Sequence, residues 1–488
     1  MNPILILRSF FQSYFYESGK QTKLKVGLVL ILFLFLSGFI NYLLCETIYF
    51  IPLYSADQLY TPLFVNDWMS GKGIAHWYLP PSPYFFPDMG CMAILYFVFP
   101  FLYLPTMYGV LQMGFLYLGF YSFFSSKLSK LTTIQLLIWF QTLFTILSLL
   151  GKCLGDKPLP LVYFVSNAHH STGFFFSLFL VSLYYQSQSK ENQISFLQNK
   201  AEFSIEKKIC RSNWFSKLFL PKQVSKFLFL LGFSLLYLSD RFSFCIGMFC
   251  LIVIKFSEMD SKNWKGIFWK KIIFYLGMIL FYFIIMELIF YSLKTKLQIP
   301  NSFGILLDSL QTKSLGEITF LATHYVYDFS KLLVYENRTL LGFLFVFVFF
   351  FRRFPQQLKR LFLLLIPILL FLLLVVGRFT YLHPYPIRYL FPLWFFGLVG
   401  VSWVLAKQKN RFPLPMLLFS LLLWILVFSA FPKPRKEVQE FHQSITKREV
   451  PYTQEKPIRF WTGGNQKPIP IQDDGKPYRW ITGAFHTP

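Results

Sequence analysis

The chain of 488 residues is 55% hydrophobic and 21% aromatic, and only 14% of its residues are charged. This composition excludes an ordinary soluble globular protein and favours an all-α polytopic membrane protein. The net charge of +24 does not indicate nucleic acid as a partner. The basic residues gather in short segments between apolar stretches, as the positive-inside rule describes.

Apolar stretches of suitable length predict a bundle of about 11 to 12 membrane segments, because a spanning helix needs roughly 20 apolar residues. They lie near 26–45, 91–105, 107–125, 132–150, 161–184, 227–239, 242–254, 272–293, 339–351, 361–376, 390–406 and 415–431. Together they define a transmembrane domain over residues 1–431. The first stretch is expected to be a retained anchor, not a removed signal peptide. The second is short and bounded by Pro100 and Pro105, so we expect it to be re-entrant or interfacial.

Basic segments between these stretches indicate the orientation of the chain. The N-terminus and the segments 185–226, 255–271, 352–360 and 407–411 are rich in lysine or arginine, which predicts that they are cytoplasmic and contact anionic lipid headgroups. The extracytoplasmic segments are then 46–90, the Ser239-Asp240-Arg241 turn, 294–338, 377–389 and the tail 432–488. The expected location is a bacterial inner membrane.

The loop 46–90 concentrates acidic residues in a chain that has few. Asp57 could act as a general base that takes a proton from an acceptor hydroxyl. It could also bind a divalent cation through oxygen, or form part of a helix cap at Ser55-Ala56-Asp57. Asp88 could be a second carboxylate facing the same pocket, or a cap that follows Pro87.

A motif in this loop resembles the first extracytoplasmic loop of GT-C fold glycosyltransferases, in particular the protein-mannosyltransferase and lipid A aminoarabinose-transferase branch. It consists of Asp57-Gln58-x-Tyr60, Ser70-Gly71, Trp77 and a proline-rich turn. The resemblance implies a GT-C-like fold, a sugar donor carried on a polyprenyl phosphate, and Asp57 as the catalytic base. This chain has Gln58 where a second acid is usual, and Pro80-Pro81-Ser82-Pro83 where the family has a Lys-Pro-Pro turn.

Other ionisable residues near predicted span ends are further site candidates, because such residues at membrane depth mark functional sites by default. His169 or His170 could bind a sugar hydroxyl or phosphate, or relay a proton; the alternative is a polar interfacial role. Asp240 and Arg241 could pair with each other, or Asp240 could face the same extracytoplasmic cavity as Asp57.

The segment 377–389 carries Arg378, His383 and Arg388 without an acid, on the side where positive charge is disfavoured. Arginine binds phosphate through planar bidentate donors, so these residues are candidates to hold the carrier phosphate. The alternative is interfacial arginine beside aromatic residues. Arg388-Tyr389-x-x-Pro392 also resembles a late-span motif of GT-C enzymes.

Three other features complete the prediction. The apolar spacing of Phe303, Leu306, Leu307 and Leu310 predicts an amphipathic helix on the membrane surface within 294–338. The proline-rich tail predicts an extended or strand-rich appendage, with turns at Gly463-Gly464 and Asp474-Gly475. Six scattered cysteines without zinc-ligand spacing predict free thiols.

The expected function is transfer of a sugar from a polyprenyl-phosphate carrier to a glycan, lipid or protein acceptor on the extracytoplasmic face. No metal site is expected from residue spacing, although the sequence leaves a divalent cation open. Two alternatives stay open: a transporter or flippase for a lipid-linked or anionic substrate, and a non-catalytic scaffold whose tail binds a partner.

Overall fold

The described part of the chain is mostly helical, as the sequence predicts. The computed structural model describes residues 38–43, 46–47, 50–72, 77–80, 82–125, 130–156, 160–166, 171–184, 222–258, 267–297, 299, 314–356, 358–367, 369, 391–407, 422, 425, 429, 435–472 and 474–478. Within them, the helices that the argument uses are α3 (Phe50–Leu53), α4 (Ala56–Met69), α5 (Gly90–Tyr96), α6 (Leu104–Ser125), α7 (Lys130–Cys153), Ser171–Tyr184, α10 (Lys222–Ser239), α11 (Arg241–Glu258), α12 (Ile267–Lys296), α14 (Leu315–Lys331), α15 (Arg338–Phe351), α17 (Phe391–Lys407), α19 (Arg435–Ser444) and α20 (Tyr452–Trp461).

Aromatic side chains form the centre of the core, where α17 packs along α7 and the helix Ser171–Tyr184 packs against α17. The ring of Phe174 meets those of Phe391 and Phe395 nearly edge to face, at 4.9 and 5.2 Å between centroids. Phe164 joins the same group. Edge-to-face packing is favourable because the ring edge is positive and its face negative. This core gives many of the phenylalanines a structural role.

The segment 91–105 is not one continuous helix. α5 ends at Tyr96, a turn follows, and a short 3₁₀ turn at Phe101–Tyr103 leads directly into α6. Pro100 stands immediately before that turn. The short length agrees with the expectation that this segment does not cross a membrane by itself.

Two stretches within the described residues, Phe101–Phe120 and Thr132–Cys153, are long and apolar enough to cross a membrane by length and composition. Shorter apolar helices occur at six further places, including α10, α15 and α17. About 61% and 56% of the two long windows is buried inside the protein, and the core helix of a soluble protein could have the same character. The all-α architecture is therefore shown, and the number of spans is not.

The described tail contains two helices where its proline content predicts an extended or strand-rich appendage, so that prediction is wrong for α19 and α20. α19 and α20 are helices, and the strands β1 (Glu449–Pro451) and β2 (Ile469–Ile471) pair in parallel over three residues each. Pro451 stands at the N-cap of α20, where its missing N–H costs nothing, and Pro457 lies inside the helix. Residues 455–461 are all buried, so tertiary packing stabilises the helix despite Pro457. The predicted turns at Gly463-Gly464 and Gly475 are confirmed, since all three glycines have positive φ.

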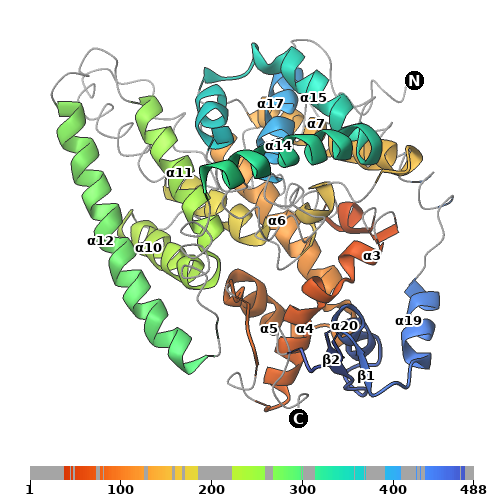
Figure 1. Ribbon diagram of the computed structural model, residues 1–488. Coiled ribbons are helices and arrows are strands. Elements are labelled where there is room, and N and C mark those ends of the chain that lie inside the picture. Colours follow the sequence, from red (N-terminus) through yellow and green to blue (C-terminus); the bar gives the residue numbers. More distant parts are fainter. Residues whose placement is uncertain are drawn as a thin grey trace, which may run out of the picture.

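The C-terminal segment, defined here as residues 435–478, lies against α4 (Figure 1). α20 packs along α4, and α19 connects to it beside β1. In the same view α12 stands at one side of the molecule beside α10. The segment that follows the last apolar stretch thus returns to the first loop of the chain.

Candidate functional site

Asp57 lies in the first turn of α4 and is half-buried. The N-cap of this helix is Ser55, whose side chain makes no capping hydrogen bond, so Asp57 is not the cap itself. The hydroxyl of Tyr452, at the start of α20, donates a hydrogen bond to Oδ1 of Asp57 over 3.1 Å. A residue 395 positions away therefore holds the leading candidate for the base.

Among the described residues, the charge of Asp57 acts on several ionisable groups. Tyr60 comes from the same helix, Tyr452 and Lys456 from α20, and Tyr478 from the chain after β2. Burial raises the pKa of Tyr60 and of Tyr452 well above the ordinary value, and the negative charge of Asp57 adds to the shift in both. Both phenols therefore stay protonated at neutral pH and can donate hydrogen bonds.

Asp88 is buried in a π-helical turn, Phe85–Met89, which precedes α5. The N-cap position of α5 belongs to Met89, so the alternative in which Asp88 caps that helix is wrong. The hydroxyl of Thr172 donates a hydrogen bond to Oδ1 of Asp88 over 3.2 Å. Asp88 also raises the pKa of Tyr60, as Asp57 does. The charges of Asp57 and Asp88 thus both act on the pKa of Tyr60.

Asp240 is buried between α10 and α11 and caps α11. Its Oδ1 accepts the backbone N–H of Ser243 over 3.4 Å, and its Oδ2 accepts the hydroxyl of the same serine. This is the usual geometry of an N-cap, which satisfies a donor in the first turn. Gly173 fits tightly beside it, because a Cβ there would stand 2.8 Å from Oδ2. Thr172, the neighbour of Gly173 in the chain, contacts Asp88. Asp240 therefore lies close to Asp88.

The ion-pair partner of Arg241 is Glu287 of α12. The two are 3.3 Å apart, and the guanidinium lies 3.8 Å from the centre of the Phe290 ring. Tyr237 donates a hydrogen bond to the same carboxylate over 2.6 Å. Glu287 was not among the predicted site residues.

The other predicted site residues, His169, His170, Arg378, His383 and Arg388, lie outside the described residues, as do Phe303, Leu306, Leu307 and Leu310. Their predicted roles stay predictions. Asp57 and Asp88 both act on Tyr60. Asp240 lies near Asp88, because Thr172 and Gly173 at the start of the helix Ser171–Tyr184 contact one acid each.

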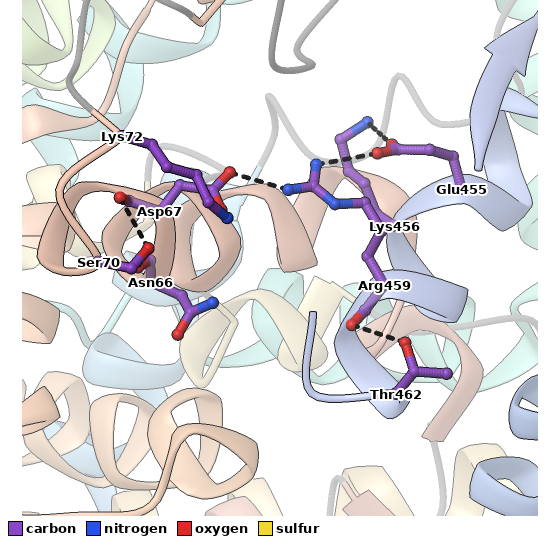
Figure 2. Close-up of polar contacts among 8 residues, drawn as sticks. All are labelled: Asn66, Asp67, Ser70, Lys72, Glu455, Lys456, Arg459 and Thr462. Atoms are coloured by element: carbon purple, nitrogen blue, oxygen red, sulfur yellow. Dashed lines mark hydrogen bonds and ion pairs between the residues drawn. The ribbon is translucent and has the colours of Figure 1, made fainter. Parts of the chain in front are cut away.

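The sequence prediction missed a row of buried charges between α4 and α20, which we call the charge row. Asp67 of α4 pairs with Arg459 over 2.8 Å, and Arg459 pairs with Glu455 over 3.0 Å. Lys456 pairs with Glu455 over 3.1 Å, and Lys72 closes the other end on Asp67 over 2.8 Å. Figure 2 shows Arg459 reaching between the two acids.

Four members of the charge row are almost fully excluded from solvent. The side chains of Glu455 and Lys456 are 0% exposed, that of Arg459 is 1% and that of Asp67 is 2%. Burying charges is costly unless each has a partner, and here positive and negative groups alternate along the row. Burial lowers the pKa of Lys456, although Glu455 and Asp57 both oppose the shift. The spacing of Tyr452, Glu455 and Arg459 by three and four residues was a helical signal in the sequence, but the prolines concealed it.

Among the described residues no three His, Cys, Asp or Glu side chains come together as a metal-binding group. Cys91, Cys153, Cys245 and Cys250 are free thiols. What the site offers chemically is a half-buried carboxylate with a phenol donor, and a second, buried carboxylate nearby.

Comparison with known proteins gives no relative. No family model matches the chain, and neither a curated protein nor a solved structure matches it. Function must therefore be argued from the chain itself.

Proposed function

We propose that the chain is a multi-pass membrane glycosyltransferase with a GT-C-like arrangement. It transfers a sugar from a polyprenyl-phosphate carrier to an acceptor hydroxyl on the extracytoplasmic face. The exposed apolar surface, the contacts between loops and the surroundings of Asp57 support this proposal.

Apolar side chains on the outer face of α12 support a membrane location. The most exposed are between 60% and 67% accessible, and they are Leu280, Phe281, Leu288 and Tyr291. α15 is similar, with Phe345, Val348 and Phe349 between 68% and 71% accessible. Monomeric soluble proteins rarely expose contiguous apolar patches of this kind, whereas lipid covers them without cost.

Contacts between loops support the predicted orientation. The backbone N–H of Tyr84 donates to the carbonyl of Ser239 over 3.2 Å, which joins the first loop to the turn before α11. Asp156 accepts the N–H of Arg338 over 3.1 Å, which joins the end of α7 to the end of the 294–338 loop. Each pair must lie on one side of a bilayer, and the sequence assigns both members of the first pair to the extracytoplasmic side.

A contact of the tail supports the re-entrant interpretation of the segment 91–105. Arg435, at the start of α19, donates to the carbonyl of Leu102 over 2.7 Å and pairs with Glu46 over 2.8 Å. If 91–105 crossed the membrane, Leu102 would lie on the opposite side from Glu46. With that segment re-entrant, α6 enters from the extracytoplasmic side and Asp156 emerges there as well.

The observation that carries the proposal is the half-buried Asp57 on the predicted extracytoplasmic side, which accepts a hydrogen bond from Tyr452 and, like Asp88, raises the pKa of Tyr60. A general base needs one accessible carboxylate in a fixed position. Asp88 is buried, so it suits an orienting role better than proton transfer.

In the proposed step, one oxygen of Asp57 accepts the proton of the acceptor hydroxyl. The acceptor oxygen forms a bond to the anomeric carbon as the bond from that carbon to the carrier phosphate oxygen breaks. The bonding electrons leave with the carrier phosphate, whose growing charge needs cations nearby. Arg378 and Arg388 are the sequence candidates for those cations.

The alternatives receive less support. A scaffold with a free tail is disfavoured because the described part of the tail packs on α4 and α19 begins with a contact to Leu102. A transporter would use charged residues along a pathway through the spans. The charged groups of the described site instead gather among the predicted extracytoplasmic segments.

The first prediction tests Asp57 as the base. Purified protein in lipid vesicles is incubated with polyprenyl phosphate carrying radiolabelled mannose or aminoarabinose, together with lipid and peptide acceptors. Asp57→Asn should lower transfer by about 100-fold or more, because the amide cannot accept the proton. Asp474→Asn, a change of the same kind in a half-exposed turn, is the control and should leave transfer unchanged. Full activity of Asp57→Asn would exclude the proposed base.

A further inference from the structure

α4 and α20 form a parallel pair in which the start of one helix lies beside the start of the other. Tyr452 meets Asp57 at one end, and Arg459 meets Asp67 about two turns further along. The same face of α20 therefore carries both the phenol donor and the buried charges. A displacement of α20 along α4 would move both contacts together.

The row fixes the register of this pair more strongly than apolar packing alone could. A shift of α20 by one residue along α4 would separate Asp67 from the guanidinium of Arg459, and an unpaired buried charge is strongly unfavourable. The Lys456 ammonium also lies 4.0 Å from the centre of the Tyr452 ring. This cation–π contact restricts the position of the ring.

We propose that the C-terminal segment is part of the candidate site: Tyr452 is a positioning residue for the Asp57 carboxylate, and the charge row sets where Tyr452 stands. The phenol hydroxyl donates to Oδ1, which orients the carboxylate. This inference rests on the proposed function for its catalytic meaning, but the positioning itself can be tested without any substrate.

The second prediction uses a thiol in place of the carboxylate. In Asp57→Cys, the rate of alkylation by iodoacetamide is measured against pH, and the peptide around residue 57 is quantified by mass spectrometry. A donated hydrogen bond favours the charged form of the group that accepts it. Adding Tyr452→Phe should therefore raise the pKa of the introduced thiol by about 0.5 to 1. The other ionisable groups near this position, Tyr60, Lys456 and Tyr478, are the same in both proteins.

The matched control is Tyr96→Phe, which removes a phenol that donates to Asn66 at the other end of α4 over 3.2 Å. It should leave the titration of the thiol unchanged. The proposal would be overturned if Asp57→Cys and the double variant Asp57→Cys with Tyr452→Phe gave the same titration curve while their thermal stability was unaltered.

Activity provides the second readout. Tyr452→Phe should lower transfer about tenfold, mainly in kcat, and move the acidic limb of the pH profile to higher pH, because the carboxylate loses a stabilising donor. Arg459→Met should have the same effect, and Arg459→Lys should restore part of it.

The two proposals can fail separately. If Asp57→Asn keeps full transfer, the proposed function fails, while the thiol titration still reports on Tyr452. If Asp57→Asn is inactive but Tyr452→Phe behaves as wild type in both readouts, the function stands and the positioning role fails.

Discussion

Individual tyrosines beside the acids of the first loop differ chemically from tyrosines elsewhere on a surface. Burial raises the pKa of Tyr54, Tyr60 and Tyr452 well above 10.0. Each folded phenol keeps its proton at a pH at which the unfolded chain has lost it. The unfolded state then binds fewer protons than the folded state, so the free energy of unfolding falls as pH rises above about 10.

The third prediction follows from this difference. Thermal unfolding in detergent, followed between about pH 9 and 11, should show a stability that is constant at first and then declines. Tyr452→Phe should make the decline less steep, because one ionisable phenol is removed. Lys456 acts in the opposite direction, since its lowered pKa favours the folded state as pH rises. An identical decline in Tyr452→Phe and wild type would contradict the buried, protonated state of this phenol.

At the scale of elements, the pairing of α4 with α20 is held by ions as well as by aromatic contacts. Phe50 of α3 stacks on Trp461, the last residue of α20, with 5.9 Å between ring centroids. Breaking a buried ion pair by removing one partner leaves an uncompensated charge, which costs about 3–5 kcal/mol. Arg459 pairs with Asp67 of α4 across the two helices, so the docking of α20 depends on it.

The fourth prediction concerns Arg459→Met. Hydrogen exchange of the amides of α20 should become faster by two orders of magnitude or more, in line with a loss of about 3 kcal/mol. Lys436→Met is the control, since Lys436 pairs with Glu440 on the exposed face of α19 at 3.8 Å and such pairs contribute less than about 1 kcal/mol. If the amides of α20 exchanged at the same rate in Arg459→Met as in the control, the charge row would not be what holds α20 in place.

Local patterns in the sequence predicted most of the described helices, the break near Pro100 and the glycine turns of the tail. They could not predict α20, because its helix depends on burial against α4, 395 residues away. For the same reason they gave Asp57 no partner, and they did not pair Arg241 with Glu287. Residue spacing and composition do not identify a partner that is distant in the chain. The sequence therefore predicted Asp57 and Arg241 as candidates but not their partners Tyr452 and Glu287.

On the scale of the whole molecule, the outer helices expose apolar surface and the contacts between predicted extracytoplasmic segments gather the polar groups. α12 is the clearest case, since Ile284, Ile285 and Ile289 are between 40% and 49% accessible in addition to the residues described above. A bilayer would cover this surface. The charge row and Asp57 join α4 to α20, so they would lie outside the bilayer together with the C-terminal segment.

The fifth prediction tests that arrangement. A lipophilic diazirine is activated by light in vesicles that contain the protein, and labelled peptides are mapped by mass spectrometry. Label should concentrate on α12 and α15, where apolar side chains are exposed. α19, whose residues are largely exposed but polar, is the internal control and should stay unlabelled. Equal labelling of α19 and α12 would rule out the membrane location.

The parallel pairing of α4 with α20 also has a consequence for how the protein is made. α4 is synthesised early, and Asp67 has no Arg459 to pair with until almost the entire chain has been synthesised. A chain that stops before Tyr452 would contain every apolar stretch, yet it would carry an acid without its cation and a site without its donor. Premature termination and bulky C-terminal fusions should therefore yield protein that inserts normally but is recognised by quality-control proteases.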